Sequence, residues 1–291
     1  MATYKKLRKF SSTVHIVEMD PNIYRLDITE GIPGKLEKLS EMFGEPRLWE
    51  ITDIRMNAQF FGGTVRGYGA FADPTDNLSD KPSSAGYADL TYKNSRLAMG
   101  NDGDWTIGTS YGLLSCGIDF NKYHDWHGYL MAGRNPRSMA GYLRNGNNAF
   151  VVVDGRLKNL SSGVTADQQA EWGKEYGFTE LANFDGGGSS TLILGDKILN
   201  SPSDGRERLI VSAIMAYRRY TLTELPVLRK GSKGVYVNLL QRLLGITPDG
   251  KFGSNTEVAL GIFQLSEKLK LDKIAGPLTW RTLLKWRGIS C

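Results

Sequence analysis

The spacing of apolar residues changes near residues 220–227, and this change predicts two domains of different kinds. Upstream, short apolar runs such as Leu209–Tyr217 are rich in β-branched residues, which is typical of buried strands. Downstream, apolar residues recur at helical spacing. The chain has 291 residues, about twice the common domain size. We therefore predict an α+β protein with a β-rich domain with few helices over 1–220, a linker over 221–226, and a small three-helix domain over 227–291.

Several runs in the first domain predict strands. Thr13–Val17 and Tyr24–Ile28 alternate apolar and polar residues, which predicts two half-buried strands on either side of a turn at Asp20–Asn22. Phe150–Val153 is a continuous β-branched run that ends in Asp154-Gly155-Arg156 and predicts another strand. The chain also contains 34 glycines, more than usual, as expected for a fold with many tight turns.

One helix and one glycine-rich loop stand out among these strands. Thr165–Gln168 has the pattern of a capping box and predicts a helix over 166–176 that ends before Gly177. The loop Asp185–Ser190 lies between two apolar runs, Leu181–Phe184 and Thr191–Leu194. This order of strand, loop and strand differs from the strand, loop and helix of a nucleotide-binding P-loop.

The C-terminal segment predicts three short helices. The first contains Val235 to Leu244 and stops at Gly245, a favourable residue for a helix end. Ser254–Glu257 has the pattern of a capping box ahead of the second. Gly276-Pro277 opens the third helix, because proline is favoured in the first turn.

Charge and composition exclude several classes of protein. The net charge of +5 favours an anionic partner, but Lys and Arg form no dense block, so nucleic acid is not expected. No apolar run approaches the roughly 18 residues of a membrane span. The basic N-terminus lacks an apolar region, so we expect synthesis in the cytoplasm without a signal peptide. Cys116 and Cys291 are expected to be free thiols, as in a reducing compartment.

The glycine-rich loop has the residues of an anion site. Consecutive glycines let the backbone reach positive φ and direct several N–H groups into one concavity. Asp185, Ser189 and Ser190 add a carboxylate and two hydroxyls. A simple tight turn is the alternative interpretation of Gly186–Gly188.

The C-terminal segment resembles the peptidoglycan-binding module of bacterial and phage wall hydrolases. The resemblance rests on spaced motifs along the whole segment: Gly231-x-x-Gly234-Val235, Leu240-Gln241, Asp249-Gly250-x-Phe252-Gly253-x-x-Thr256, Phe263-Gln264 and Gly276-Pro277-x-Thr279-Trp280-x-x-Leu283. It implies docking on murein and no catalysis in this segment.

The larger domain is similar to the phosphodiester glycosidases from about residue 50 to 217. The motifs occur in the family's order: Asn57–Phe61, Asn135–Gly141, Val153–Arg156, Ser162–Thr165, Asn183–Thr191 and Asn200–Arg208. Two of these motifs depart from the family pattern. Ala58-Gln59 stands where the family has a glycine pair, and Ser138-Met139-Ala140 stands where it has Thr-Ala-Ile. The resemblance implies hydrolysis of a sugar-1-phosphodiester at the anomeric carbon.

This reaction suggests roles for particular residues. Guanidinium groups match a phosphate bidentately, so Arg137, Arg156 and Arg208 are candidate clamps, with Arg137 also counted among the catalytic residues. Asp185 or Asp154 is the candidate catalytic carboxylate. The remaining residues predicted to bind substrate or phosphate are Asn57, Gly186, Gly187, Gly188 and Ser189.

Other candidate sites are weaker. His124-Asp125-Trp126-His127 lacks a known zinc spacing, so we predict neither metal nor cofactor. Cys116 lies outside any known Cys–His nucleophile motif. The aromatic segment Trp105–Trp126 suits either sugar stacking or core packing.

Together the two resemblances predict an endolysin-like wall hydrolase. Its partners would be bacterial peptidoglycan and an anionic wall polymer, reached from the cytoplasm of a phage-infected host after release; the oligomeric state is open. Two alternatives remain. The first domain could cut a glycoside or peptide bond of murein, or the chain could be a virion protein that binds walls without catalysis.

Overall fold

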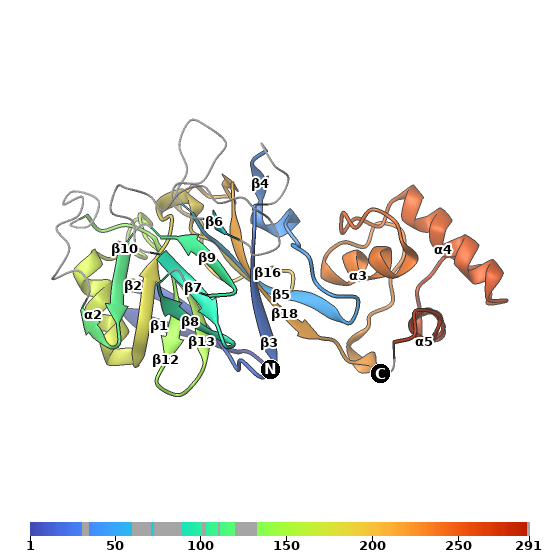
Figure 1. The fold of residues 1–291 in the computed structure, drawn as a ribbon. Helices are drawn as coiled ribbons and strands as arrows, with labels where there is room; N and C mark the ends of the chain where they lie inside the picture. Colours follow the sequence, from blue (N-terminus) through green and yellow to red (C-terminus); the bar gives the residue numbers. More distant parts are fainter. Residues whose placement is uncertain are drawn as a thin grey trace. The chain divides into compact units, whose positions relative to one another are not determined.

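The computed structural model describes residues 1–30, 35–59, 71–72, 89–100, 103–109, 111–119 and 133–289. The chain divides into two compact units, Met1–Met42 with Ile54–Ala216, and Phe43–Asp53 with Tyr217–Cys291. The contacts thus group 43–53 with the C-terminal helices, whereas the sequence pattern places this segment in the first domain. The class is α+β, as predicted, with a β-rich first unit and a helical second one (Figure 1).

The largest sheet of the first unit has seven strands in the order β1-β2-β13-β12-β14-β10-β11. Its neighbouring strands pair antiparallel, and β2 pairs with β13 in the register Ile16↔Val151. The strands are β1 (Thr3–Lys9), β2 (Ser12–Met19), β10 (Tyr111–Ser115), β11 (Ile118–Asp119), β12 (Arg137–Leu143), β13 (Asn148–Val153) and β14 (Phe178–Asn183).

Three smaller sheets complete the described strands. Their orders are β16-β15-β5-β18-β3, β17-β4 and β6-β9-β7-β8. The strands are β3 (Tyr24–Thr29), β4 (Glu37–Lys38), β5 (Glu50–Asn57), β6 (Phe71–Ala72), β7 (Asp89–Lys93), β8 (Arg96–Met99), β9 (Trp105–Gly108), β15 (Leu192–Leu194), β16 (Lys197–Ile198), β17 (Leu209–Ile210) and β18 (Ala213–Arg219).

The seven-stranded sheet is covered on both faces. Val17 and Phe150 on one face pack into a core shared with Leu26, Ile54 and other residues of the smaller sheets. Ile16 and other residues of the opposite face pack against the helix α2 (Ala166–Tyr176), which lies on that side in Figure 1. The prediction of a half-buried strand over 13–17 is therefore wrong, because both faces of β2 are buried. The strand β3 does alternate as predicted.

The helix α2 is confirmed together with both of its ends. Thr165 Oγ1 accepts from the Gln168 amide at 3.2 Å, and the Gln168 side chain accepts from the Thr165 amide, which completes the capping box. Gly177 follows the helix with φ of 107°, a conformation that favours glycine.

The apolar run 209–217 forms two strands and not one. The strands β17 and β18 are separated by Val211-Ser212. At this break, the Ser212 carbonyl accepts from Ala58 N at 3.1 Å, and its hydroxyl accepts from Gln59 N at 3.0 Å. The break thus fixes the backbone just after β5.

The second unit contains the three predicted helices, α3 (Val235–Leu244), α4 (Ser254–Ser266) and α5 (Pro277–Trp286). Their buried faces meet around Leu239, Leu260 and Trp280. Gly245 ends α3 with φ of 75°, and Pro277 opens α5, both as predicted. The short 3-10 helices within the described ranges are η1 (Leu39–Glu41), η3 (Gly187–Ser189) and η4 (Leu222–Glu224).

The predicted capping box at Ser254–Glu257 is wrong. The helix α4 begins after Gly253 and has no side-chain cap. Thr256, the third residue of the predicted box, is buried and accepts from Gln241 Nε2 at 2.9 Å. Thr256 therefore serves contact between helices and not a helix cap.

Two glutamines make equivalent networks in this unit. Gln241 Nε2 donates to an aspartate, a backbone carbonyl and a threonine 8, 10 and 15 residues further along the chain, and Gln264 Nε2 does the same at identical separations. The unit is thus an internal repeat of helix and loop. The partners are Asp249, Lys251 and Thr256 for Gln241, and Asp272, Ile274 and Thr279 for Gln264.

An arginine attaches the segment 43–53 to the helices. The Arg242 guanidinium donates to the carbonyl oxygens of Pro46, Arg47 and Glu50 at 3.1, 2.8 and 2.8 Å. Burial lowers the pKa of Arg242 to about 10. These bonds explain why 43–53 belongs to the second unit.

Candidate functional site

The glycine-rich loop follows β14 and is held by segments that are distant in sequence. Asp185 N donates to Ala58 O at 2.9 Å, and Gly187 N donates to Pro136 O at 3.0 Å. Gly155 packs so closely on Pro136 that a Cβ on it would lie 2.5 Å from Pro136 N. The motifs around 57, 135, 155 and 185 therefore meet at one place, as the predicted site requires.

The Asn57 side chain holds these segments together by hydrogen bonds. Its Nδ2 donates to Asp185 O at 2.7 Å, and its Oδ1 accepts from Ser138 Oγ at 2.7 Å and Thr191 N at 3.0 Å. The side chain is 1% exposed. We therefore interpret Asn57 as a residue that positions the loop and not as a substrate ligand.

Each of the three glycines has one of the predicted arginines against it. A Cβ on Gly186 would lie 3.8 Å from Arg137 Cδ, and one on Gly187 would lie 3.1 Å from Arg156 Nη1. A Cβ on Gly188 would overlap with the ion pair between Arg208 and Asp204. Guanidinium groups thus lie against Gly187 and Gly188, whereas a Cβ on Gly186 would lie 2.6 Å from Pro136 O.

Arg156 and Arg208 present their charge to solvent beside the loop. Arg156 Nε and Nη2 donate to Asn135 Oδ1 at 3.2 and 2.7 Å, and the residue has a positive φ of 57°, which is unusual for arginine. Arg208 Nη2 lies 2.7 Å from Asp204 Oδ2, with 43% of the Arg208 side chain exposed. Both groups suit a phosphate bound over Gly187 and Gly188.

Arg137 has a different position. It is 5% exposed, and its Nε and Nη2 donate to Val164 O at 3.2 Å and Gly133 O at 2.9 Å. Its aliphatic part packs on Gly186. We interpret Arg137 as a support of the loop, one step behind the two exposed arginines.

Asp185 is the carboxylate at the start of the loop and is 7% exposed. Burial raises its pKa to about 6, against the opposing effects of the Ser189 hydroxyl, the Arg208 guanidinium and the Gly186 amide. The Ser189 hydroxyl lies beside this carboxylate, although their geometry falls short of a full hydrogen bond. A buried carboxyl group titrating near neutrality is typical of catalytic acids and bases.

The hydroxyl of Ser190 is also buried in the loop. Its Oγ makes no hydrogen bond with any residue that the structure describes. Buried polar groups are nearly always paired, so this hydroxyl and that of Ser189 lack the partner that such groups normally have.

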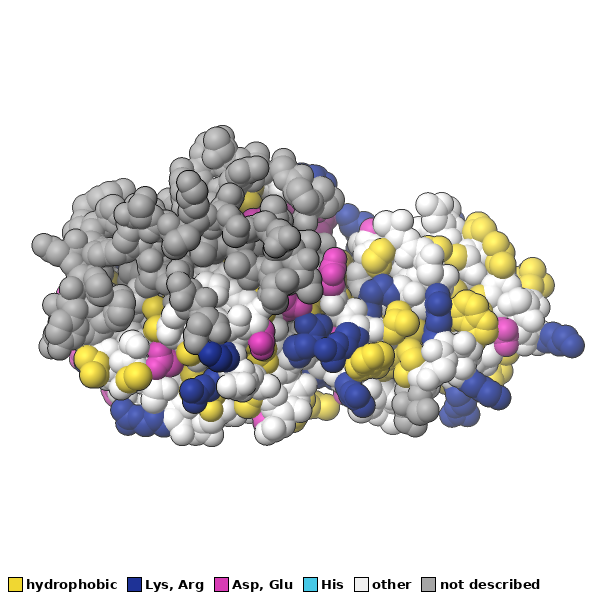
Figure 2. Space-filling view, in the orientation of Figure 1, with side chains coloured by type: hydrophobic (Ala, Val, Ile, Leu, Met, Phe, Trp, Pro, Cys, Tyr) yellow, Lys and Arg dark blue, Asp and Glu magenta, His cyan; other side chains and the backbone are white. Residues whose placement is uncertain are grey.

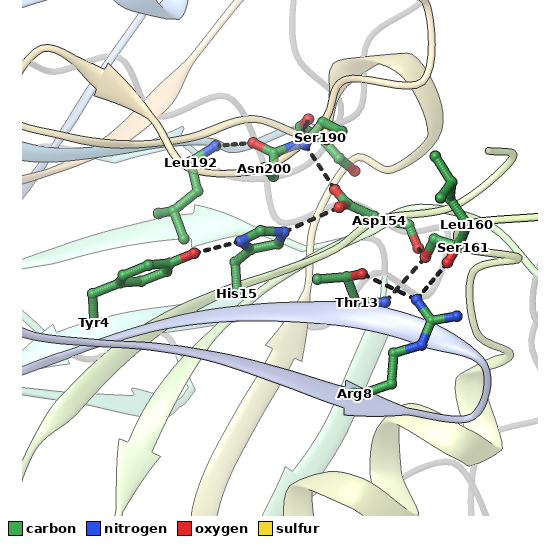
Figure 3. Close-up of polar contacts among 11 residues, drawn as sticks. Tyr4, Arg8, Thr13, His15, Asp154, Leu160, Ser161, Ser190, Leu192 and Asn200 are labelled. Atoms are coloured by element: carbon green, nitrogen blue, oxygen red, sulfur yellow. Dashed lines mark hydrogen bonds and ion pairs between the residues drawn. The ribbon is translucent and has the colours of Figure 1, made fainter.

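Asp154 is held within a chain of polar groups (Figure 3). Its Oδ2 lies 3.0 Å from His15 Nε2, its Oδ1 accepts from Ser201 N at 2.9 Å, and His15 Nδ1 lies 2.8 Å from the hydroxyl of Tyr4. Both carboxylate oxygens are thus engaged. The structure therefore favours Asp185 over Asp154 as the carboxylate that meets substrate.

Asn200, next to Ser201, links this series of hydrogen-bonded polar groups to the glycine-rich loop. Its Nδ2 donates to Ser190 O and its Oδ1 accepts from Leu192 N, both at 2.9 Å. His15 and Asn200 are functional candidates that sequence reasoning did not assign. The signal for His15 was a histidine within an otherwise apolar strand.

The structure describes part of the weaker candidates, which are the metal site, the cysteines and the aromatic segment. Among the described residues, no group of three or more His, Cys, Asp or Glu could hold a metal ion, and His124–His127 lie outside these residues. Cys116 is exposed and free, whereas Cys291 is outside the described part. Trp105 is buried, stacks on Tyr92 at 5.4 Å and donates to Leu26 O, so it belongs to the core.

The helical unit exposes hydrophobic side chains interspersed with Lys and Arg (Figure 2). On α4, Val258, Ile262 and Leu265 are 55, 63 and 60% exposed. On α5, Trp286 is 53% exposed and has the Arg287 guanidinium 4.5 Å from its ring centroid. Such a mixed surface suits a polymer with sugar, peptide and anionic groups.

Comparisons with known families agree with this geometry. Residues 80–217 match the family model of phosphodiester glycosidases, and residues 237–283 match that of the peptidoglycan-binding domain. The chain carries a phosphodiester glycosidase-family domain followed by a peptidoglycan-binding domain. Both resemblances inferred from the sequence are confirmed, and the glycine-rich loop with its arginines lies within the glycosidase-family domain.

Solved structures show the same fold for the glycosidase-family domain. The catalytic domain of zebrafish N-acetylglucosamine-1-phosphodiester α-N-acetylglucosaminidase, auto-inhibited by its pro-peptide, aligns with a TM-score of 0.58 and 16% identity, over 76% of this chain and 83% of that one. A hypothetical protein from Synechocystis aligns with a TM-score of 0.54 and 13% identity, over 75% and 62%.

A curated relative is the SPbeta prophage-derived uncharacterized protein YomE of Bacillus subtilis (strain 168). It is 28% identical over 149 residues, which cover 46% of this chain and 23% of the relative. The match therefore spans less than a quarter of the relative's length. As to membranes, no helix in the described ranges combines the length and apolar character of a span.

Proposed function

We propose that this protein is a wall hydrolase that cleaves a sugar-1-phosphodiester, such as a GlcNAc-1-phosphate linkage of a wall polymer, while its C-terminal domain holds it on murein. The observation that carries the proposal is the loop itself: a buried Asp185 beside glycines against which Arg156 and Arg208 lie. This combination provides one carboxylate for the sugar and two cations for the phosphate.

The two exposed arginines would neutralise the departing phosphate. As the bond between the anomeric carbon and the phosphate oxygen breaks, negative charge grows on that oxygen, and the fixed guanidinium groups stabilise it. A phosphate leaving group is weakly basic, so a strong general acid is less necessary than this charge neutralisation. Gly187 and Gly188 allow both cations to lie directly over the backbone.

Asp185 would act on the other side of the reacting carbon. In its ionised form it takes a proton from the attacking water, whose oxygen bonds to the anomeric carbon, or it stabilises the oxocarbenium-like transition state. The products are a free sugar and a phosphomonoester. Because its pKa is about 6, Asp185 is mostly ionised at neutral pH and still basic enough to accept a proton.

The peptidoglycan-binding domain would raise the local concentration of substrate. A tether can increase apparent affinity by about two to four orders of magnitude without new contacts in the active site. The net charge of +5 also favours an anionic wall.

A phage origin is part of the proposal. It is supported by the match to a relative whose name describes it as prophage-derived. In that setting the protein would be made in the cytoplasm of an infected host and would act on the bacterial wall after release, as an endolysin does.

The test uses purified Gram-positive walls, with and without teichoic acid, alongside a soluble GlcNAc-1-phosphodiester. We expect GlcNAc and phosphomonoester in equal amounts from the soluble substrate, new phosphomonoester only from walls that carry the polymer, and neither product with Asp185→Asn. Loss of turbidity of polymer-free walls without phosphomonoester would instead show a murein hydrolase. Wall binding without any product would show a non-catalytic adhesin.

A further inference from the structure

A cavity of about 550 Å³ is lined in part by Asp204 and Arg208, the ion pair that also lies against Gly188. It is built on the ribbon of β4 and β17, in which Lys38 pairs with Leu209, and on the preceding turn. No part of the reaction described above uses it. Its lining residues are Leu36, Lys38, Asp204, Arg206, Glu207, Arg208 and Leu209.

The side chains that line this cavity carry more positive than negative charge, since its basic residues are Lys38, Arg206 and Arg208 and its acids are Asp204 and Glu207. Its two acids are engaged, because Asp204 pairs with Arg208 at 2.7 Å and Glu207 Oε1 accepts from Ser40 N at 2.9 Å. The side chains of Lys38 and Arg206 make no hydrogen bond or ion pair with the residues that the structure describes, and both residues are exposed. Two cations are therefore available to a ligand in the cavity.

Arg208 connects this cavity to the reaction site. Its guanidinium lies against Gly188, influences the pKa of Asp185 and also lines the cavity. A phosphate bound by Arg208 over Gly188 would therefore lie close to both Asp185 and the cavity. The alcohol esterified to the other side of this phosphate stays on it after hydrolysis and departs as part of the phosphomonoester.

We propose that the cavity is a subsite for the alcohol of the departing phosphomonoester, and that this alcohol carries a second anionic group, which Lys38 and Arg206 bind. Leu36 and Leu209 offer an apolar wall to the carbon skeleton between the two anions. This inference rests on the proposed function and narrows its substrate class from any sugar-1-phosphodiester to one with a charged alcohol. Two wall components share this chemistry: the next phosphate of a poly(polyol phosphate), and a carboxylate of a muramoyl peptide.

The test compares three soluble GlcNAc-1-phosphodiesters, whose alcohols are methanol, glycerol phosphate and a muramoyl peptide. The full chain is compared with Lys38→Gln/Arg206→Gln and with the matched control Lys6→Gln/Arg144→Gln, which removes the same charge from exposed positions elsewhere. We expect the wild type to prefer a charged alcohol over methanol by about tenfold in kcat/KM, mainly through KM. The subsite variant should lose this preference, and the control should keep it.

The preferred alcohol distinguishes the two sources: glycerol phosphate indicates a polyphosphate chain and the muramoyl peptide indicates murein. Equal kcat/KM for all three substrates with the wild type, or an equal loss of preference in both double variants, would overturn the subsite. If no substrate is cleaved, the proposed function fails, and calorimetric binding of a short poly(glycerol phosphate) then judges the cavity. Binding that is lost in the subsite variant alone supports it, and binding unaffected by the variant overturns it.

Discussion

His15 Nε2 lies 3.0 Å from Asp154 Oδ2, and the two side chains are 2% and 5% exposed. The other oxygen of Asp154 accepts from the Ser201 amide. Asp154 thus joins the end of β13, just before Arg156, to the segment that runs from Ser201 to Arg208. Arg156 and Arg208, beside the glycines, are therefore positioned through a carboxylate whose two oxygens both have protein partners. Asp154 was predicted as a catalytic candidate, and the structure assigns it this supporting position.

The pair makes a prediction for His15. His15→Leu leaves a buried carboxylate short of a donor and should lower the free energy of unfolding by about 3 kcal/mol, measured by urea denaturation. His15→Gln places an amide near the position of Nε2 and should restore more than half of the loss. Tyr4→Phe, at a partly exposed contact, should cost less than about 1 kcal/mol. Equal losses in the Leu and Gln variants would contradict this role.

Asp185 should control the pH dependence of hydrolysis. Because the ionised form is active and burial raises the pKa to about 6, kcat/KM should rise with pH up to about 6 and then level off. Asp185→Asn should lose at least about 100-fold in kcat at pH 7. Asp167→Asn, on the first turn of α2, is the control and should retain full activity. A pH profile that is flat between 4 and 7 would argue against this carboxylate.

The ionised form of Asp185 should lower the free energy of unfolding. A carboxyl group whose pKa is raised from 3.8 to about 6 binds its proton more tightly in the folded state, so its contribution to the free energy of unfolding falls as pH rises between these values. Asp185→Asn should therefore be more stable than wild type above pH 6, by up to about 3 kcal/mol at about 1.4 kcal/mol per pKa unit. The difference should vanish towards pH 4 in thermal melts. A variant less stable than wild type at pH 8 would contradict the assigned burial cost.

Gly188 should tolerate no side chain. A Cβ would overlap with Asp204 and Arg208, so Gly188→Ala should displace the guanidinium and reduce kcat/KM by about 100-fold or more. Gly195→Ala is a control for backbone strain, because Gly195 has φ of 59°, unlike Gly188, and nothing lies within 4 Å of the added Cβ. That variant should lose about 1 kcal/mol of stability from backbone strain and keep its activity. Comparable activity losses in both would mean that the loss does not come from the overlap with Arg208.

The glutamine networks should hold the peptidoglycan-binding domain together. Gln241→Leu leaves the Gly250 amide without its acceptor at 2.8 Å, and should destabilise this domain by about 2–4 kcal/mol. Gln264→Leu should have a similar effect, since its network is equivalent. Asn255→Leu, at an exposed position of α4, is the control. The readouts are denaturant unfolding and sedimentation with purified peptidoglycan, and unchanged unfolding in both glutamine variants would refute the repeat as a stabilising feature.

Local patterns predicted the elements that depend on neighbouring residues. The capping box at Thr165, the left-handed Gly177 and the proline that opens α5 are all confirmed, because each involves contacts within one turn of helix. The spaced motifs also predicted that the segments around Asn57, Asn135 and Asp185 belong to one site.

Tertiary contacts explain what the sequence could not reveal. Thr256 looks like part of a helix cap, yet Gln241 of another helix uses it. The run 209–217 is uniformly apolar, but Ser212 must break it to bond the backbone of Ala58 and Gln59. Asp154 and Asp185 both precede glycine, and the partners that distinguish their environments, such as His15 on a neighbouring strand and the Ser201 amide, come from distant parts of the sequence.

The central claim is that the protein cleaves the bond between the anomeric carbon of the sugar and the phosphate oxygen, and that this happens beside Asp185. Hydrolysis of a GlcNAc-1-phosphodiester in ¹⁸O-labelled water, followed by mass spectrometry of the phosphomonoester, tests it most directly. We predict a phosphomonoester without ¹⁸O, because water attacks the sugar carbon. Incorporation of ¹⁸O into the phosphomonoester would show attack at phosphorus and would contradict the account.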